Sequence, residues 1–185
     1  MLKFSFNPKK STQAAGVLLK LNNGDMDMYL FIKMLYLADR AALAKWQEPI
    51  TGDEMVSMPY GPVPNTLYGL TKGHFKSLRS EWEKFISNAE EEANRVFLKG
   101  NPGTDELSRA EITILESVHS KFKNYTWKRM RDFCHNLPEY EDVGTSSKPL
   151  PVERILEALG KTASEIAAAE KSLRQTQLAD LLLRR

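Results

Sequence analysis

The chain has 185 residues, of which 42% are hydrophobic and 27% are charged, so it can bury the core of one compact domain. Its net charge of +2 argues against a protein whose main affinity comes from phosphate neutralisation, although a local basic face is compatible with it. One cysteine, Cys134, rules out an internal disulfide, and no apolar run reaches the length of a signal peptide or a membrane span. We therefore expect a cytoplasmic protein without a membrane partner.

Two helices are predicted in the first 46 residues. The first covers Lys10 to Leu21, with Ser11 or Thr12 available as its N-cap, and Gly24 suits the turn after it. The second covers Met28 to Trp46 and has apolar residues on more than one side. A helix of this kind is usually central in its domain.

The next segment combines a turn, a short strand and a corner. Pro49 ends the helical pattern, and Glu54 to Met58 alternates weakly enough to predict only a short strand. Gly61-Pro62 marks a corner, because glycine gives conformational freedom and proline makes the turn rigid. Pro64 fits the first turn of a helix that extends to about Lys72.

Residues Glu83 to Lys99 have two interpretations. One is a β-hairpin with Phe85 on one arm, Val96 on the other and a charged tip at Glu90–Glu92. The other is a helix continuing from Leu78 to Phe97, because the Glu-Ala run has high helix propensity. We favour the hairpin.

The C-terminal half is predicted to be mostly helical. Ser108 and Glu111 form a capping box that begins a helix, and Thr126 can cap another that extends to about Asn136. A short helix follows at Val152–Leu159 and a long one at Ser164–Arg185. The predicted fold is therefore mainly α with a small β element (α+β), a compact helical domain with a short β-hairpin and a C-terminal helix. We expect a domain over residues 1–143, a linker over 144–151 and a helical extension over 152–185.

No pattern in the sequence indicates catalysis. Cys134 and His135 are adjacent on a predicted helix and point about 100° apart, so they cannot form a thiol–imidazole pair. A buried, inert thiol is the better interpretation of Cys134, and His119 fits a hydrogen-bonded core position. The three histidines form no spaced metal-binding pair. We predict no catalytic, metal-binding or cofactor-binding residue and no cofactor.

A basic segment with aromatic residues extends from Lys121 to Arg131 and includes Tyr125 and Trp127. Such a segment can contact nucleic acid. The nearby acidic residues weaken this interpretation, and a solvated helix face is favoured. These acidic residues are Asp132, Glu139, Glu141 and Asp142.

Three stretches together resemble a known family. They are Lys33-Met34-Leu35-Tyr36-Leu37-Ala38, Pro49-Ile50-Thr51-Gly52, and Tyr60-Gly61-Pro62-Val63-Pro64 followed by Leu67-Tyr68. This combination is similar to the Panacea domain of SocA-like antitoxins, a phage-associated domain family, and the resemblance covers roughly residues 10 to 140. It implies a mostly helical domain without enzymatic activity that neutralises a toxin encoded nearby by direct binding.

The expected contact residues follow from the motif and from the C-terminal helix. The motif supplies Lys33, Tyr36, Asp39, Arg40, Tyr60, Gly61, Pro62 and Tyr68, and the helix supplies Leu178, Leu181 and Leu182. Two alternatives remain open. One is a DNA-binding transcriptional regulator with winged-helix-like elements, and the other is an adaptor that delivers the toxin to a protease.

Overall fold

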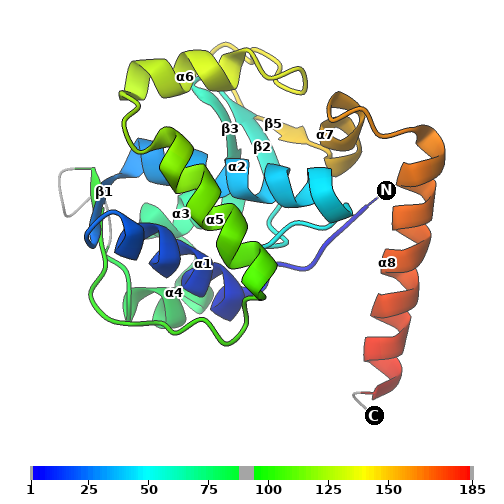
Figure 1. Cartoon of the computed structure of the whole chain (residues 1–185), viewed down its shortest axis with the longest axis horizontal. Coiled ribbons are helices and arrows are strands. Elements are labelled where there is room, and N and C mark those ends of the chain that lie inside the picture. Colours follow the sequence, from blue (N-terminus) through cyan, green and yellow to red (C-terminus); the bar gives the residue numbers. More distant parts are fainter. Residues whose placement is uncertain (1, 88–93, 184–185) are drawn as a thin grey trace.

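The fold places helices around a central helix and a small sheet (Figure 1). The computed structural model describes residues 2–87 and 94–183. The elements in these ranges are α1 (Pro8–Leu21), β1 (Asp25–Asp27), α2 (Met28–Trp46), β2 (Met55–Met58), β3 (Gly61–Pro64), α3 (Asn65–Thr71), α4 (Lys76–Glu83), β4 (Arg95–Phe97), α5 (Arg109–Phe122), α6 (Trp127–His135), β5 (Lys148–Leu150), α7 (Val152–Ala158) and α8 (Ala163–Leu183). The predicted mainly α fold with a small β element is confirmed.

Helix α2 is the centre of the core, as its sequence predicts. Every residue from Phe31 to Asp39 is buried, because α1, α5, α6 and strand β3 all contact this helix. The Asp27 side chain caps its N-terminus by accepting a hydrogen bond from the Leu30 amide at 3.1 Å. Asp27 also places a negative charge at the positive end of the helix dipole.

The β structure consists of two small antiparallel sheets. Strand β2 lies between β3 and β5, and Met55 pairs with both Pro64 and Leu150. The segment 144–151, expected to be a linker, therefore contains an edge strand. Gly61-Pro62, expected to form a corner, belongs to β3, so the turn at Pro59-Tyr60 is the tip of a β2–β3 hairpin.

The favoured hairpin over Glu83–Lys99 is present in part. Ile86 and Leu98 form an isolated β-bridge, whereas the principal partner of β4 is β1, with Val96 opposite Met26. The continuous-helix alternative is wrong, because α4 ends at Glu83 and Val96 is buried in a strand. The expected charged tip at Glu90–Glu92 lies outside the described residues.

Helix α1 begins two residues earlier than predicted. Asn7 is its N-cap and accepts a hydrogen bond from the Lys10 amide at 3.0 Å. Ser11 and Thr12, the predicted caps, are buried inside the helix. The reason is Pro8, whose fixed φ suits the first helical position.

The capping predictions for α5 and α6 are confirmed. Ser108 and Glu111 form the reciprocal capping box, and the Thr126 hydroxyl accepts a hydrogen bond from the Arg129 amide. His119 is hydrogen-bonded to Asn22 through Nε2 at 3.1 Å, as expected for a core histidine. Among the described residues, none of the helices combines the length and apolarity that a bilayer span requires.

Candidate partner-binding site

The β2–β3 hairpin packs on α2, and the buried ammonium of Lys33 on α2 contacts the hairpin. Lys33 is 1% exposed, and its Nζ donates a hydrogen bond to the carbonyl of Pro62 at 2.8 Å. Nζ also lies 5.3 Å from the centroid of the Tyr29 ring. Burial lowers the pKa of Lys33 to about 7, against a smaller opposing influence from Cys134. Lys33 thus ties the central helix to the hairpin.

Gly61 is required where the hairpin, α2 and α6 converge. Its φ is +99°, and a Cβ atom there would lie 2.9 Å from Cβ of Cys134 and 3.2 Å from Nζ of Lys33. A side chain would therefore be both strained and crowded. Glycine is therefore needed in the Tyr-Gly-Pro motif because of backbone conformation and close packing, and a catalytic role is not required to explain it.

The tip of the hairpin is fixed through its backbone carbonyls. The hydroxyl of Tyr29 donates to the carbonyl of Tyr60 at 2.7 Å, and Nε2 of His135 donates to that of Pro59 at 3.0 Å. A carbonyl only accepts hydrogen bonds, so this geometry assigns the proton to Nε2. The Tyr140 hydroxyl donates to the carbonyl of Met58 at 3.1 Å, and its ring stacks on His135. These contacts hold Tyr60 outward, with 58% of its surface exposed.

A second polar network fixes α2 to the segment after α6. The carboxylate of Glu139 is fully buried and accepts hydrogen bonds from the Tyr36 hydroxyl at 2.8 Å and from Nε of Arg40 at 2.5 Å. Burial would raise the pKa of Glu139, but the hydrogen bonds from Arg40 and Tyr36 outweigh it and keep the pKa below its usual value. Tyr36 and Arg40 are therefore committed to an internal carboxylate.

Asp39 organises the turn that follows α2. One carboxylate oxygen accepts hydrogen bonds from the amides of Ile50 and Thr51 at 2.8 and 2.9 Å, and the other accepts the Thr51 hydroxyl. Burial raises the pKa of Asp39 to about 7 in spite of these bonds. Asp53 in the same turn accepts the amide of Leu67 at 2.9 Å and so caps α3. This turn positions α3 beside the hairpin.

An apolar cavity of about 390 Å³ opens between α2, the hairpin and α3. Lys33, Tyr60 and Tyr68 contribute to its wall. The other lining residues are Met28, Tyr29, Ile32, Met58, Pro59 and Val63. Aromatic and methionine side chains of this kind are enriched at the cores of protein–protein interfaces. The arrangement is suited to receive an apolar side chain from a partner.

The motif residues thus fall into two groups. Lys33, Tyr36, Asp39, Gly61 and Pro62 are buried and build the scaffold. Arg40 and Tyr68 are partly exposed, and Tyr60 is exposed. The motif did not identify Met28, Tyr29 or Met58 as cavity-lining residues. The tendency of methionine and tyrosine to line binding surfaces is a signal that could have indicated them.

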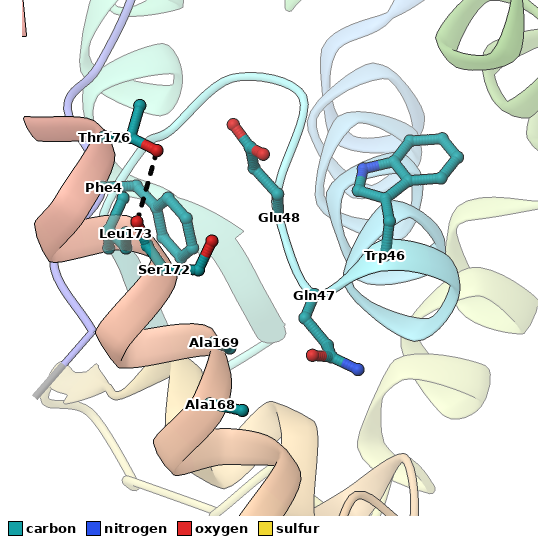
Figure 2. Close-up of a pocket in the computed structure, with 9 residues that line it drawn as sticks. All are labelled: Phe4, Trp46, Gln47, Glu48, Ala168, Ala169, Ser172, Leu173 and Thr176. Atoms are coloured by element: carbon teal, nitrogen blue, oxygen red, sulfur yellow. Dashed lines mark hydrogen bonds between the residues drawn. The ribbon is translucent and has the colours of Figure 1, made fainter. Parts of the chain in front are cut away.

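The predicted C-terminal contacts lie on α8, away from this cavity. Leu178 and Leu182 are 60% and 65% exposed, and the side chain of Leu181 lies outside the described residues. Helix α8 leans on the N-terminal segment, where Nε2 of Gln177 donates to the carbonyl of Lys3 at 2.9 Å. A hollow of about 270 Å³ lies between α8 and the end of α2. Figure 2 shows Phe4 beside Leu173 on one side of it and Trp46 on the other.

The candidate nucleophile is inert in this environment. Cys134 is fully buried, and burial raises the pKa of its thiol to about 11, so it is protonated at neutral pH. No cluster of three or more potential metal ligands occurs within residues 2–87 and 94–183.

Comparison with known families identifies the domain. The model of the family described as antitoxin SocA-like, Panacea domain, matches residues 31–140, which is more than half of the chain. The protein belongs to the SocA-like Panacea family. Neither the curated proteins nor the solved structures contain a match to the chain. The Panacea match includes the hairpin, α3, α5 and α6, so the Glu139 network lies within the matched residues, whereas Tyr29 at the hairpin tip precedes them.

Proposed function

We propose that this protein is a cytoplasmic antitoxin that neutralises a protein toxin encoded nearby by binding it directly. Membership of the SocA-like antitoxin family supports this role. The proposed site of toxin binding rests on one observation: the exposed Tyr60 lies beside an apolar cavity lined in part by methionines. Binding there would mask the active site of the toxin or block a conformational change that the toxin needs.

A binding role, and not catalysis, is supported by how the polar groups are used. Lys33, Asp39 and Glu139 are buried and hydrogen-bonded to other parts of the chain. Groups whose hydrogen bonds are made within the chain fix its elements relative to one another and are not directed at a substrate. The side chains left at the surface around the hairpin are mostly apolar or aromatic, which suits an interface.

Coexpression and calorimetry test the proposal. The adjacent gene product should be toxic alone and harmless when coexpressed with this protein. Tyr60→Ala should raise the Kd for the toxin roughly 30-fold, because truncation of a central aromatic anchor costs about 2 kcal/mol. Trp127→Ala is the matched control, since Trp127 is 55% exposed but lies at the far end of α6. Wild-type affinity for Tyr60→Ala together with loss for Trp127→Ala would refute the proposed location.

Delivery of the toxin to a protease is a second candidate, favoured by the exposure of Leu178 and Leu182 on α8. Exposed leucines one helical turn apart form an apolar strip that a partner groove can bind. Replacing both by Ser should then lengthen the half-life of the toxin in cells while leaving its affinity for this protein unchanged. An unchanged half-life would leave direct blocking as the mechanism.

A further inference from the structure

The connection between α5 and α6 forms a basic corner at one edge of the molecule (Figure 1). Residues 117–131 contain five cationic side chains and no carboxylate, with Glu116 and Asp132 as the flanking acids. The five cations are Lys121, Lys123, Lys128, Arg129 and Arg131. We call this set, together with Trp127, the basic corner.

An aromatic cluster gathers these cations onto one surface. Nζ of Lys121 lies 5.5 Å from the centroid of the Phe133 ring, and the guanidinium of Arg129 lies 4.1 Å from that of Tyr125. The Tyr125 and Phe133 rings are themselves 6.3 Å apart. Lys121 on α5 and Arg129 on α6 therefore lie against adjoining rings, so their charges add up at one place.

The charges of the basic corner are largely available. Lys121, Lys123, Lys128 and Arg129 are exposed, and none of them forms an ion pair with a residue that the structure describes. Arg131 alone is paired, with Asp132 at 2.8 Å. Trp127 has 55% of its surface exposed, and the Arg131 guanidinium lies 5.4 Å from the centroid of its ring.

Two of the four nearby acids, Glu139 and Glu141, are paired with cations outside the basic corner. Glu139 is buried and accepts hydrogen bonds from Arg40 and Tyr36, both on α2. Glu141 pairs with Lys148 and Arg154 beside the sheet. A carboxylate oxygen of Asp142 accepts the amide of Gly144. Glu139 and Glu141 are thus neutralised by cations outside the basic corner, and Asp132 offsets the charge of Arg131.

We propose that the basic corner binds single-stranded nucleic acid, with the lysines and Arg129 on phosphates and Trp127 stacked on an unpaired base. Exposed cations supply the phosphate contacts, and an exposed indole supplies a stacking platform that bases already stacked within a duplex cannot use. This activity goes beyond toxin neutralisation and lies at the opposite end of α6 from the hairpin cavity. The two surfaces can therefore be disabled separately.

Fluorescence anisotropy with labelled oligonucleotides of about 20 nucleotides tests the proposal. The full chain should bind oligo-dT and oligo-U more tightly than a duplex of equal length. The Kd should rise as KCl increases from about 50 to 200 mM, with a log–log slope of about −2 to −3 for three or four phosphate contacts. Trp127→Ala should weaken binding about tenfold with little change in this slope.

Two triple variants that lose the same charge distinguish binding at the basic corner from nonspecific attraction by the net charge of the protein. Replacing Lys123, Lys128 and Arg129 by Gln should flatten the salt slope by about 2. The control replaces three exposed lysines on other helices, Lys20, Lys45 and Lys171, by Gln and should retain binding. Circular dichroism should report the same fold for both triple variants.

Three outcomes would overturn the proposal. The first is no oligonucleotide binding at low salt, and the second is an equal loss of affinity in both triple variants. In the third, the wild type binds no oligonucleotide and the corner variant loses toxin binding. That result would mean that the corner binds an acidic surface of a protein partner instead. Failure of Tyr60→Ala to affect toxin binding would leave this inference standing, because Tyr60 is not in the corner.

Discussion

Lys33 shows how one residue can look functional in a sequence and act structurally in the fold. Its ammonium is buried and has one hydrogen-bond acceptor, the Pro62 carbonyl, among the described residues. A lysine in such a place is costly while charged, and its pKa of about 7 reflects that cost. The consequence is a pH-dependent contribution to stability.

Stability should rise with pH between about 7 and 9. The pKa of Lys33 in the folded state lies below its ordinary value of 10.5, so the unfolded state binds more protons in this range and is increasingly disfavoured as pH rises. The rise should amount to about 2 kcal/mol at most. Above pH 9 the raised pKa of Cys134 acts in the opposite direction.

Chemical denaturation across this range measures the effect. Lys33→Met keeps the stem of the side chain and removes the titrating group, so the rise should disappear. The same slope in wild type and Lys33→Met would show that another group is responsible.

Gly61 allows a comparison between two glycines that differ in their surroundings. Gly61→Ala should lower the free energy of unfolding by about 3 kcal/mol, because positive φ strain adds to the clash with Cβ of Cys134. Gly144 also has a positive φ, of +59°, but no atom lies within 4 Å of its added Cβ. Gly144→Ala should therefore cost only about 1 kcal/mol. Equal losses in urea denaturation would mean that packing at Gly61 contributes nothing.

Among the elements, α6 connects the basic corner to the hairpin cavity. Its N-terminal end carries Trp127 and the basic corner, and its C-terminal end carries Cys134 and His135 against the hairpin. Helix α5 precedes it and packs on α2, so the position of α5 determines where the corner lies. The start of α5 is therefore a point at which the scaffold can be tested.

Loss of the α5 capping box should destabilise the protein moderately. The Ser108 hydroxyl oxygen accepts the Glu111 amide at 3.2 Å, and Glu111 accepts the Ser108 amide at 2.8 Å and pairs with Lys10 on α1. Ser108→Ala should cost about 1 kcal/mol in thermal or urea unfolding. Thr113→Ala, an exposed position on the same helix, should change stability by less than about 0.5 kcal/mol. A loss at Thr113 as large as that at Ser108 would contradict the capping argument.

At the scale of the whole molecule, the C-terminal extension has two unequal parts. Ile155 and Leu156 on α7 are fully buried against the body of the protein, and β5 pairs with β2 before them. Helix α8 is mostly exposed and makes its apolar contact through few residues, such as Ile166. We therefore propose that the separable part begins after Gly160 rather than at Val152.

Two truncations test this boundary. A chain ending at Lys161 should fold and melt within a few degrees of the full chain, because little buried surface is removed. A chain ending at Pro151 should lose several kcal/mol, since removal of two buried aliphatic side chains alone costs about 4 kcal/mol or more. Similar melting temperatures for both truncations would place α7 outside the cooperative unit.

Local signals allowed much of the helical framework to be predicted. The α2 bounds follow from a continuous apolar pattern between Asp27 and Pro49, and the start of α5 follows from the Ser108–Glu111 spacing. The pairing of β4 with β1 could not be predicted, because short strands carry weak signals and their partners lie about 70 residues apart. The same limit hid the cavity, which joins Met28 to Met58 and Tyr68.

Most of the helices and the family motif could be recognised from the sequence, since each depends on residues close together in the chain, but α4 was not predicted. Tertiary structure alone decided which motif residues are buried and which, such as Tyr60, remain exposed. It also decided that Glu139 pairs with Arg40 across the core, and that Arg131 alone of the five corner cations is paired with a carboxylate that the structure describes. Partners of charged and apolar groups are chosen by long-range packing, and the spacing of residues along the chain does not contain that information.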